Sequence, residues 1–284
     1  MLQRALSTRL FVNHRLTTAW LDKLSRTRIP AVEIFCARQH FDYHNRAQIA
    51  ELGHWFRDAT LELHSLHAPI YTDDVWGVSG PQAFINISEV VKSRRIAMLD
   101  EIKRTLEVAE TIPFRYLVQH LGGNDEEYDE RKVDAAFSSL EEICLFAKQR
   151  GVEVLIENTP GAMTTSERLR IFIEQTHLNL HFCFDVVHAH HSESIPSAFQ
   201  SMKERIRSVH IHDTDGKNDH LFPLREGDAC SIDWTETMRM LAPRAGQYSY
   251  VLEINEVPDL ANPFQAAAEV FDKLQNLSNP GESE

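Results

Sequence analysis

The sequence predicts an α/β protein in which residues 1–284 form one (β/α)8 barrel domain. Eight short apolar runs alternate along the chain with longer stretches of helical spacing. Strands that alternate with helices pair in parallel through crossover helices. A doubly wound sheet is the alternative, but such a sheet usually carries a glycine-rich turn after its first strand. The turn here is Asn13-His14-Arg15, without glycine, which favours the barrel.

The apolar runs set the predicted strands, and the amphipathic stretches set the helices between them. The expected strands are Arg9–Val12, Ala31–Phe35, Leu61–His67, Tyr116–His120, Glu153–Glu157, His181–Asp185, Ser208–His212 and Tyr250–Glu253. The expected helices begin near Thr17 and continue at Arg46–Arg57, Ser88–Glu110, Lys132–Gln149, Thr165–Thr176, Ile195–Lys203, Thr235–Leu241 and Pro263–Leu277.

The N-terminal segment has two interpretations. It carries three arginines and no acidic residue before Asp22, a composition that can mark an organelle transit peptide. The other interpretation is a first strand at Leu10-Phe11-Val12, and we favour it because nothing there resembles a signal-peptide cleavage region.

Composition limits the class of protein. With 43% hydrophobic and 25% charged residues the chain is ordinary for a globular protein, and no apolar run approaches the roughly 18 residues of a membrane helix. The net charge of −13 gives no electrostatic footprint for nucleic acid. Four scattered cysteines without a CxxC pair predict a reducing, cytoplasmic location rather than a disulfide framework. A homo-oligomer is compatible with this sequence.

The most informative pattern is the residue type at the strand ends. Six consecutive predicted strands, the third to the eighth, end in or carry an imidazole or carboxylate: His67, His120, Glu157, Asp185 with His188, His210 with His212, and Glu253. The carboxyl ends of parallel barrel strands converge on one face, where active sites are built. One histidine alone would more often be a satisfied core group, and one glutamate a solvated one. Carboxylates buried together are costly without a cation, so we predict a metal site.

The motifs HAP, IEN, FDxxH, HIHD followed by HLxP and EGD, and a final LE resemble the xylose isomerase-like TIM barrel superfamily. That superfamily includes sugar phosphate isomerases and epimerases, related dehydratases, and the endonuclease IV class (AP endonuclease family 2). The resemblance spans nearly the whole chain. It implies a metal-dependent enzyme with a small sugar-like substrate. The net charge and the lack of a long apolar run argue against a nucleic-acid or membrane partner.

The resemblance to the epimerases also implies the site residues. One divalent metal would be held by Glu157, Asp185, His210 and Glu253, with Mn²⁺ or Mg²⁺ favoured and Zn²⁺ or Co²⁺ as alternatives. His210 and His212 share a strand face, so spacing does not choose between them. The resemblance further implies Glu157 and Glu253 as the catalytic proton-transfer pair. Substrate contacts are expected from His67, His120, His188, Lys217, His220 and Glu226, and Arg225 is the candidate for a phosphate.

Three alternatives to an isomerase or epimerase remain at this point. A metal-dependent dehydratase or lyase shares the first step, and a barrel that binds a metabolite without turnover would have a vestigial site. An endonuclease IV-like phosphodiesterase acting on abasic DNA needs nine metal ligands. The chain matches eight of these, including His220, but has Asn218 where an Asp is expected, with Asp219 next to it.

Overall fold

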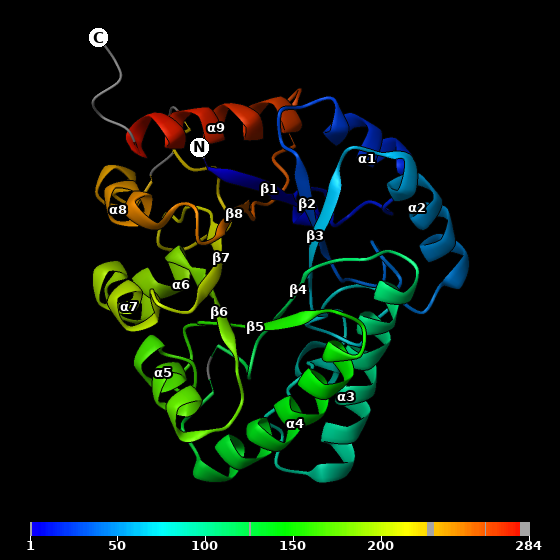
Figure 1. Cartoon of the computed structure of the whole chain (residues 1–284), viewed down its shortest axis with the longest axis vertical. Helices are drawn as coiled ribbons and strands as arrows, with labels where there is room; N and C mark the ends of the chain where they lie inside the picture. The colour runs from blue at the N-terminus through cyan, green and yellow to red at the C-terminus, as the bar shows by residue number, and fades with distance from the viewer. Residues whose placement is uncertain (1, 125, 226–229, 259, 279–284) are drawn as a thin grey trace.

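The computed structural model of the chain describes residues 2–124, 126–225, 230–258 and 260–278. Eight parallel strands form a closed barrel in chain order, with β1 paired to β8 (Figure 1). The predicted barrel is therefore confirmed. The strands are β1 Gln3–Ser7, β2 Ala31–Phe35, β3 Glu62–His67, β4 Tyr116–Gln119, β5 Glu153–Glu157, β6 His181–Asp185, β7 Ile206–Ile211 and β8 Ser249–Leu252.

Helices surround the barrel and cover its outer face (Figure 1). They are α1 Thr18–Ser25, α2 Arg46–Asp58, α3 Lys92–Glu107, α4 Glu130–Lys148, α5 Ser166–Gln175, α6 Val186–Ser192, α7 Ile195–Met202, α8 Trp234–Leu241 and α9 Pro263–Ser278. Short 3-10 helices are η1 Thr8–Phe11, η2 Gly80–Ala83, η3 Val108–Glu110 and η4 Ala242–Arg244. In the part of the chain that the structure describes, no helix is long and apolar enough to span a membrane.

The first strand differs from the prediction. The apolar run Arg9–Val12 is not a strand, since Thr8–Phe11 forms the 3-10 helix η1 and the strand lies earlier, at Gln3–Ser7. Leu10 and Phe11 are buried, and the Phe11 ring stacks on Trp20 at 4.9 Å. The apolar character of this run therefore comes from packing beneath α1, while β1 is polar at its ends.

The barrel interior has two levels. Two clusters of buried side chains lie at the lower level, one of Ala5, Ala31 and Val251 and the other of Tyr116, Val118, Leu155 and Cys183. Above them, towards the carboxyl ends of the strands, the inward-facing residues become polar. Because side chains alternate between the two faces of a strand, Val209 and Ile211 of β7 join the outer core while Ser208 and His210 face inward.

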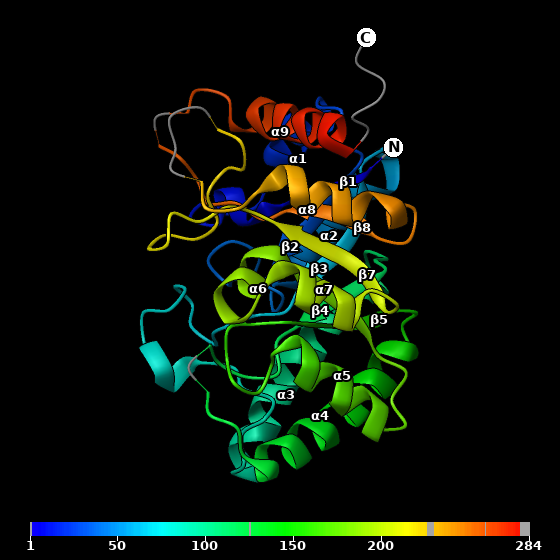
Figure 2. The same cartoon turned by 90° about the vertical axis from the view of Figure 1, so that its left-hand side faces the viewer.

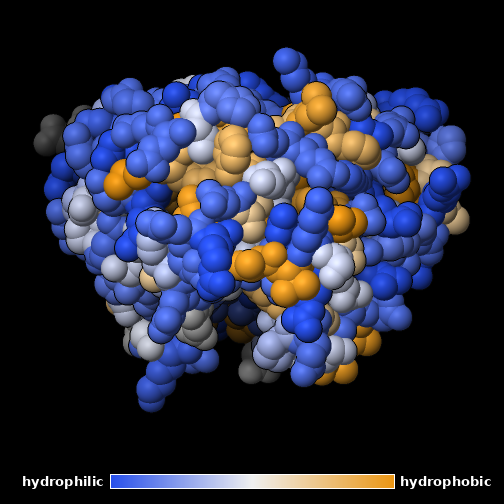
Figure 3. Space-filling view, turned by 90° about the horizontal axis from the view of Figure 1, so that it is seen from below, coloured by the Kyte–Doolittle hydropathy of each residue, from blue (hydrophilic) through white to orange (hydrophobic). Residues whose placement is uncertain are grey.

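The long connections lie on one side of the molecule. Figure 2 shows the segment between β3 and α3 and the segment after β7 projecting from the same end of the barrel. The surface seen in Figure 3 is largely hydrophilic with scattered hydrophobic side chains. The polar end of the barrel and these long connections together enclose the candidate site.

Candidate active site

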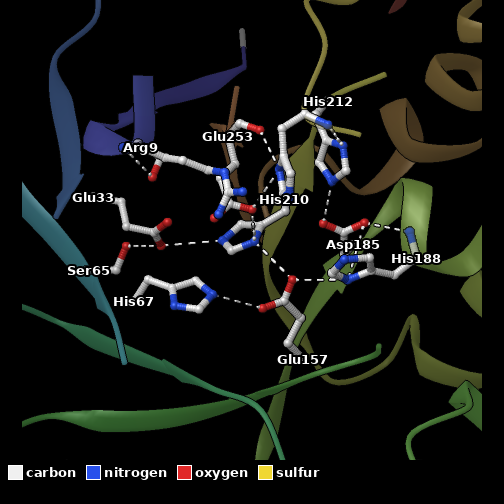
Figure 4. Close-up of polar contacts among 12 residues, drawn as sticks. Arg9, Glu33, Ser65, His67, Glu157, Asp185, His188, His210, His212 and Glu253 are labelled. Atoms are coloured by element: carbon white, nitrogen blue, oxygen red, sulfur yellow. Dashed lines mark hydrogen bonds and ion pairs between the residues drawn. The ribbon is translucent and has the colours of Figure 1, made fainter. Parts of the chain in front are cut away.

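Four side chains at the carboxyl ends of adjacent strands converge inside the barrel (Figure 4). Glu157 ends β5, Asp185 ends β6, His210 lies on β7, and Glu253 follows β8. One potential ligand atom from each lies within 4.8 Å of the others. All four residues are buried. The structure therefore brings together the four residues expected to bind the metal.

The local sequence holds Asp185 in place. Asn158, directly after β5, accepts a hydrogen bond from the Asp185 backbone N–H at 2.8 Å and donates to its carbonyl at 2.9 Å. Asp185 Oδ1 accepts from the backbone N–H of His188 at 2.7 Å and so caps α6. Asp185 is thus both the end of a strand and the start of a helix, which restricts its side chain.

Glu157 lies among histidines. Its Oε2 is 2.9 Å from His120 Nε2 and 3.4 Å from His67 Nε2, and its Oε1 is 3.1 Å from His210 Nδ1. Burial alone would raise the pKa of Glu157, but His210 and His120 outweigh burial and hold that pKa well below its usual range. The Glu157 side chain is therefore a carboxylate, the form that binds a cation or accepts a proton.

Asp185 has a similar environment on the other side of the site. His212 Nε2 lies 3.0 Å from Asp185 Oδ2, and the ring of His212 stacks on that of His220 at 4.1 Å. Burial would raise the pKa of Asp185, yet His188 and His212 lower it to about 2. Burial would lower the pKa of His188, yet Asp185 and Glu157 raise it to about 9. His212 is therefore a neighbour of Asp185, while His210 is the histidine of the four-residue group.

A fourth buried carboxylate, Glu33 on β2, lies behind His210. Its Oε2 accepts from Ser65 Oγ at 2.8 Å and is 3.3 Å from His210 Nε2 (Figure 4). Its Oε1 has no hydrogen-bond partner among the described residues. Since Nδ1 of His210 faces Glu157 and Glu253, the ring has one nitrogen towards the ligand group and the other towards Glu33.

A cavity of about 640 Å³ opens over these groups. His67, His120, His188 and His220 line it together with Glu157 and Glu253, as expected for substrate-contacting residues. Its other walls are Arg9, Phe35, Ile70, Tyr71, Trp76, Gly80, Pro81, Phe84, Asn86, Gly123, Asn124 and Glu126.

Two basic candidates from the sequence lie elsewhere. Lys217 is not brought to the cavity: it is exposed on a tight turn in which Asp215 Oδ1 accepts from the backbone N–H groups of Lys217 and Asn218. Arg225 does not line the cavity either. Glu226 lies outside the described residues.

The donor set suits a divalent cation. Three carboxylates and one imidazole are a mostly hard ligand set, and burying such carboxylates without a cation is costly. Further groups of potential ligands adjoin it, namely His67–His120–Glu157, Asp185–His188–His212 and His212–His220–Glu253. Within the described ranges, no such group includes Asp219. Asn218 donates to Asp215 Oδ2 at 2.9 Å, and Asp219 accepts from His191 Nε2 at the same distance.

Sequence reasoning missed two charged residues of the site, Glu33 and Arg9. Glu33 is the central residue of the otherwise apolar strand AVEIF, and an acid in such a run is a signal in itself. Arg9 was assigned to a strand, although it lies in η1 just past the end of β1. Helix α6, which carries His188, was also missed, because VVHAHHS is short and follows β6 without a break.

Comparison with known proteins first identifies sequence relatives. Two uncharacterised proteins of Methanocaldococcus jannaschii are each 26% identical to this chain, over 246 and 196 residues. The alignments cover 82% and 64% of this chain and 78% and 73% of those proteins.

Solved structures share the fold at low identity. A D-tagatose 3-epimerase-like protein superposes with a TM-score of 0.77 at 21% identity, covering 98% of both chains. An L-ribulose 3-epimerase gives 0.77 at 14% identity, covering 99% of this chain and 95% of its own. The IolI protein with a bound zinc atom gives 0.70 at 15% identity, covering 99% and 100%. Residues 21–276 match the family described as xylose isomerase-like TIM barrel, and this match over most of the chain shows that the protein belongs to that family.

Proposed function

We propose that this protein is a divalent-metal-dependent isomerase or epimerase acting on a small sugar, a sugar phosphate or a keto-polyol. The observation that carries the proposal is that Glu157 and Glu253 reach one buried ligand group from strands that are not neighbours in the barrel. A carboxylate on each side of a bound substrate carbon is what reversible proton transfer needs. The sugar epimerases among the solved structures of similar fold support the same class.

In this proposal the protein's own groups move the proton. Glu157, held as a carboxylate, faces the substrate carbon from β5, and Glu253 faces it from the end of β8. One accepts the proton next to the carbonyl and the other returns a proton, either to the same carbon or to its neighbour. His67, His120, His188 and His220 hold substrate oxygens in the cavity. A divalent cation bound by Glu157, Asp185, His210 and Glu253 would stabilise the negative charge that develops on those oxygens.

A dehydratase would share the first step, and no described residue separates the two reactions. The phosphodiesterase is favoured by one observation, the three histidine-containing groups that adjoin the main ligand group. The position expected for the ninth metal ligand argues against the phosphodiesterase. Asn218 is exposed and Asp219 pairs with His191, so neither supplies the additional anion that several clustered cations would require.

The test is exchange of substrate C–H hydrogen with deuterated water, measured on ketoses, their phosphates and keto-inositols with metal-loaded protein. Glu157→Gln and Glu253→Gln should each reduce the exchange by about 10²-fold or more. Glu193→Gln is the matched control, because Glu193 accepts hydrogen bonds from Ser166 at the start of α5 and lies outside the catalytic cavity. It should exchange like wild type.

Both catalytic candidates are also metal ligands, so lost exchange must be separated from lost metal. Metal content is therefore measured in every variant at saturating Mn²⁺. If the reaction is an epimerisation, the loss of exchange in each variant should differ between the two epimers, because each glutamate acts on one face of the carbon. Glu157→Gln would then show the larger loss of exchange with one epimer, and Glu253→Gln with the other. Wild-type exchange in both metal-loaded variants would remove these residues from the proposed role.

A further inference from the structure

Arg9 is the one arginine or lysine among the described residues that line the catalytic cavity. It follows β1 directly, and in Figure 4 its side chain extends from β1 towards Glu253 and His210. Neither the metal ligands nor the proposed proton transfer uses it. A permanent cation at this position therefore calls for an explanation of its own.

Three contacts hold the guanidinium group of Arg9. Its Nε donates to Asn255 Oδ1 at 3.1 Å. The guanidinium carbon lies 5.1 Å from the centre of the Phe35 ring and 4.9 Å from that of Trp76, within the range of cation–π contacts. These contacts leave the two terminal nitrogens, Nη1 and Nη2, without a hydrogen-bond partner among the described residues.

A purely charge-balancing role fits this geometry poorly. An arginine that neutralises a neighbouring acid normally forms a direct, often bidentate, pair with it. In the described part of the chain no carboxylate oxygen lies within 4.0 Å of an Arg9 nitrogen, and Glu253, Glu157 and Asp185 act on it only from farther away. Burial accordingly lowers the pKa of Arg9 in spite of these acids. The guanidinium is thus enclosed, oriented and incompletely paired.

We propose that Arg9 binds an anionic group of the substrate, a carboxylate or a phosphate, through Nη1 and Nη2. The two terminal N–H groups form a fork that matches two oxygens of one anion, whereas a hydroxyl or ketone oxygen occupies only one of them. This inference rests on the proposed function and narrows its substrate class from sugars in general to acidic sugar derivatives. It places the anion at the wall of the cavity formed by Phe35 and Trp76, beside Glu253.

The test is equilibrium binding by calorimetry to Mn²⁺-loaded protein with two matched pairs of probes. D-Glucuronate is compared with D-glucose for a carboxylate, and D-fructose 6-phosphate with D-fructose for a phosphate. Wild type should bind at least one anionic probe about tenfold or more tighter than its neutral counterpart, as expected for hydrogen bonds to a charged group. Arg9→Gln should bring that ratio close to one and leave the neutral probe within about twofold, whereas Arg9→Lys should retain part of the preference.

Arg168→Gln is the matched control, because Arg168 lies over the Tyr128 ring at 3.8 Å but outside the cavity. It should keep the full preference. The inference is overturned if neither anionic probe is preferred, or if the preference persists in Arg9→Gln, which would assign it to the metal. A preference for one probe pair identifies the anion as carboxylate or phosphate. Because binding needs no turnover, its result is separate from the exchange assay: anion preference without exchange would reject the proposed reaction and keep the Arg9 site.

Discussion

Replacing Glu33 by glutamine should weaken metal binding without unfolding the protein. Glu33 is fully buried and lies 3.3 Å from the Nε2 atom of His210, whose Nδ1 atom faces Glu157 and Glu253. A carboxylate in this position favours the tautomer in which Nε2 carries the hydrogen, and this leaves the Nδ1 lone pair free for a cation. Glutamine keeps the shape and one acceptor but removes the charge.

The size of the effect follows from the contact. A hydrogen bond to a charged group is worth about 1.5–3 kcal/mol, and each 1.4 kcal/mol is tenfold in an equilibrium constant. The affinity for Mn²⁺ should therefore fall about 10- to 100-fold, in the range known for carboxylates that support a metal-binding histidine. Ser65→Ala is the control: it removes the other donor to Glu33 Oε2 but leaves the charge beside His210, so its effect should be smaller.

The assay is competition for Mn²⁺ with a chelator of known affinity, combined with ¹⁵N spectra of the histidine rings. In wild type the His210 signals should indicate hydrogen on Nε2, and in Glu33→Gln they should show a mixture of tautomers. Circular dichroism checks that the variant is folded. Unchanged Mn²⁺ affinity in a folded Glu33→Gln variant would refute the reasoning and leave Glu33 as a structural acid only.

Three other predictions can be checked independently. Elemental analysis with anomalous scattering should find one tightly held metal per chain, at Glu157, Asp185, His210 and Glu253; two or three full sites that include His67 or His220 would support the phosphodiesterase. No incision of abasic-site duplex should occur at protein concentrations where a sugar reaction is measurable, and incision that Asp185→Ala abolishes would reverse this ranking. Burial lowers the pKa of His40 from 6.5 to about 4. As pH falls from about 6.5 towards 4, the unfolded chain therefore binds a proton at His40 before the folded protein does, and the folded protein becomes less stable. Between pH 7 and 4.5 the free energy of unfolding, from urea titrations, should drop by about 2 kcal/mol more in wild type than in His40→Gln; equal drops would contradict this.

The positions of the site residues could be predicted where the strand ended at the polar residue itself. Glu157 and Asp185 each end a strand whose outward residues are apolar, so both the apolar run and the residue that ends it could be identified in the sequence. His210 and His212 could not be separated by spacing, because residues two positions apart share one face of the predicted strand. Only the three-dimensional arrangement assigns His210 to the ligand group and His212 to Asp185.

The errors have physical causes as well. Residues 9–12 look like a strand because Leu10 and Phe11 are apolar, but their burial comes from packing against Trp20 and Phe264. The true first strand is stabilised by pairing with both β2 and β8. Backbone pairing does not depend on a particular sequence pattern, so a five-residue segment that begins with polar residues was not recognised as a strand. Because residues 9–12 were taken for the first strand, the position of Arg9 in the cavity was not predicted. Lys217 was misplaced because a turn held by Asp215 directs it into solvent.

The buried carboxylates open to solvent through the cavity that Glu157 and Glu253 line. Ala5, Ala31 and Val251 fill part of the barrel interior below the carboxylates with side chains that cannot relay a proton. In the proposed reaction, a hydrogen taken from the substrate can exchange with solvent through the cavity mouth, which the bound substrate partly fills. Isotope tracing would then compare two rates, the return of the abstracted hydrogen to the substrate and its exchange with water. Label that is retained in the product would show that the bound substrate excludes water from the cavity, and label lost to water would show that it does not.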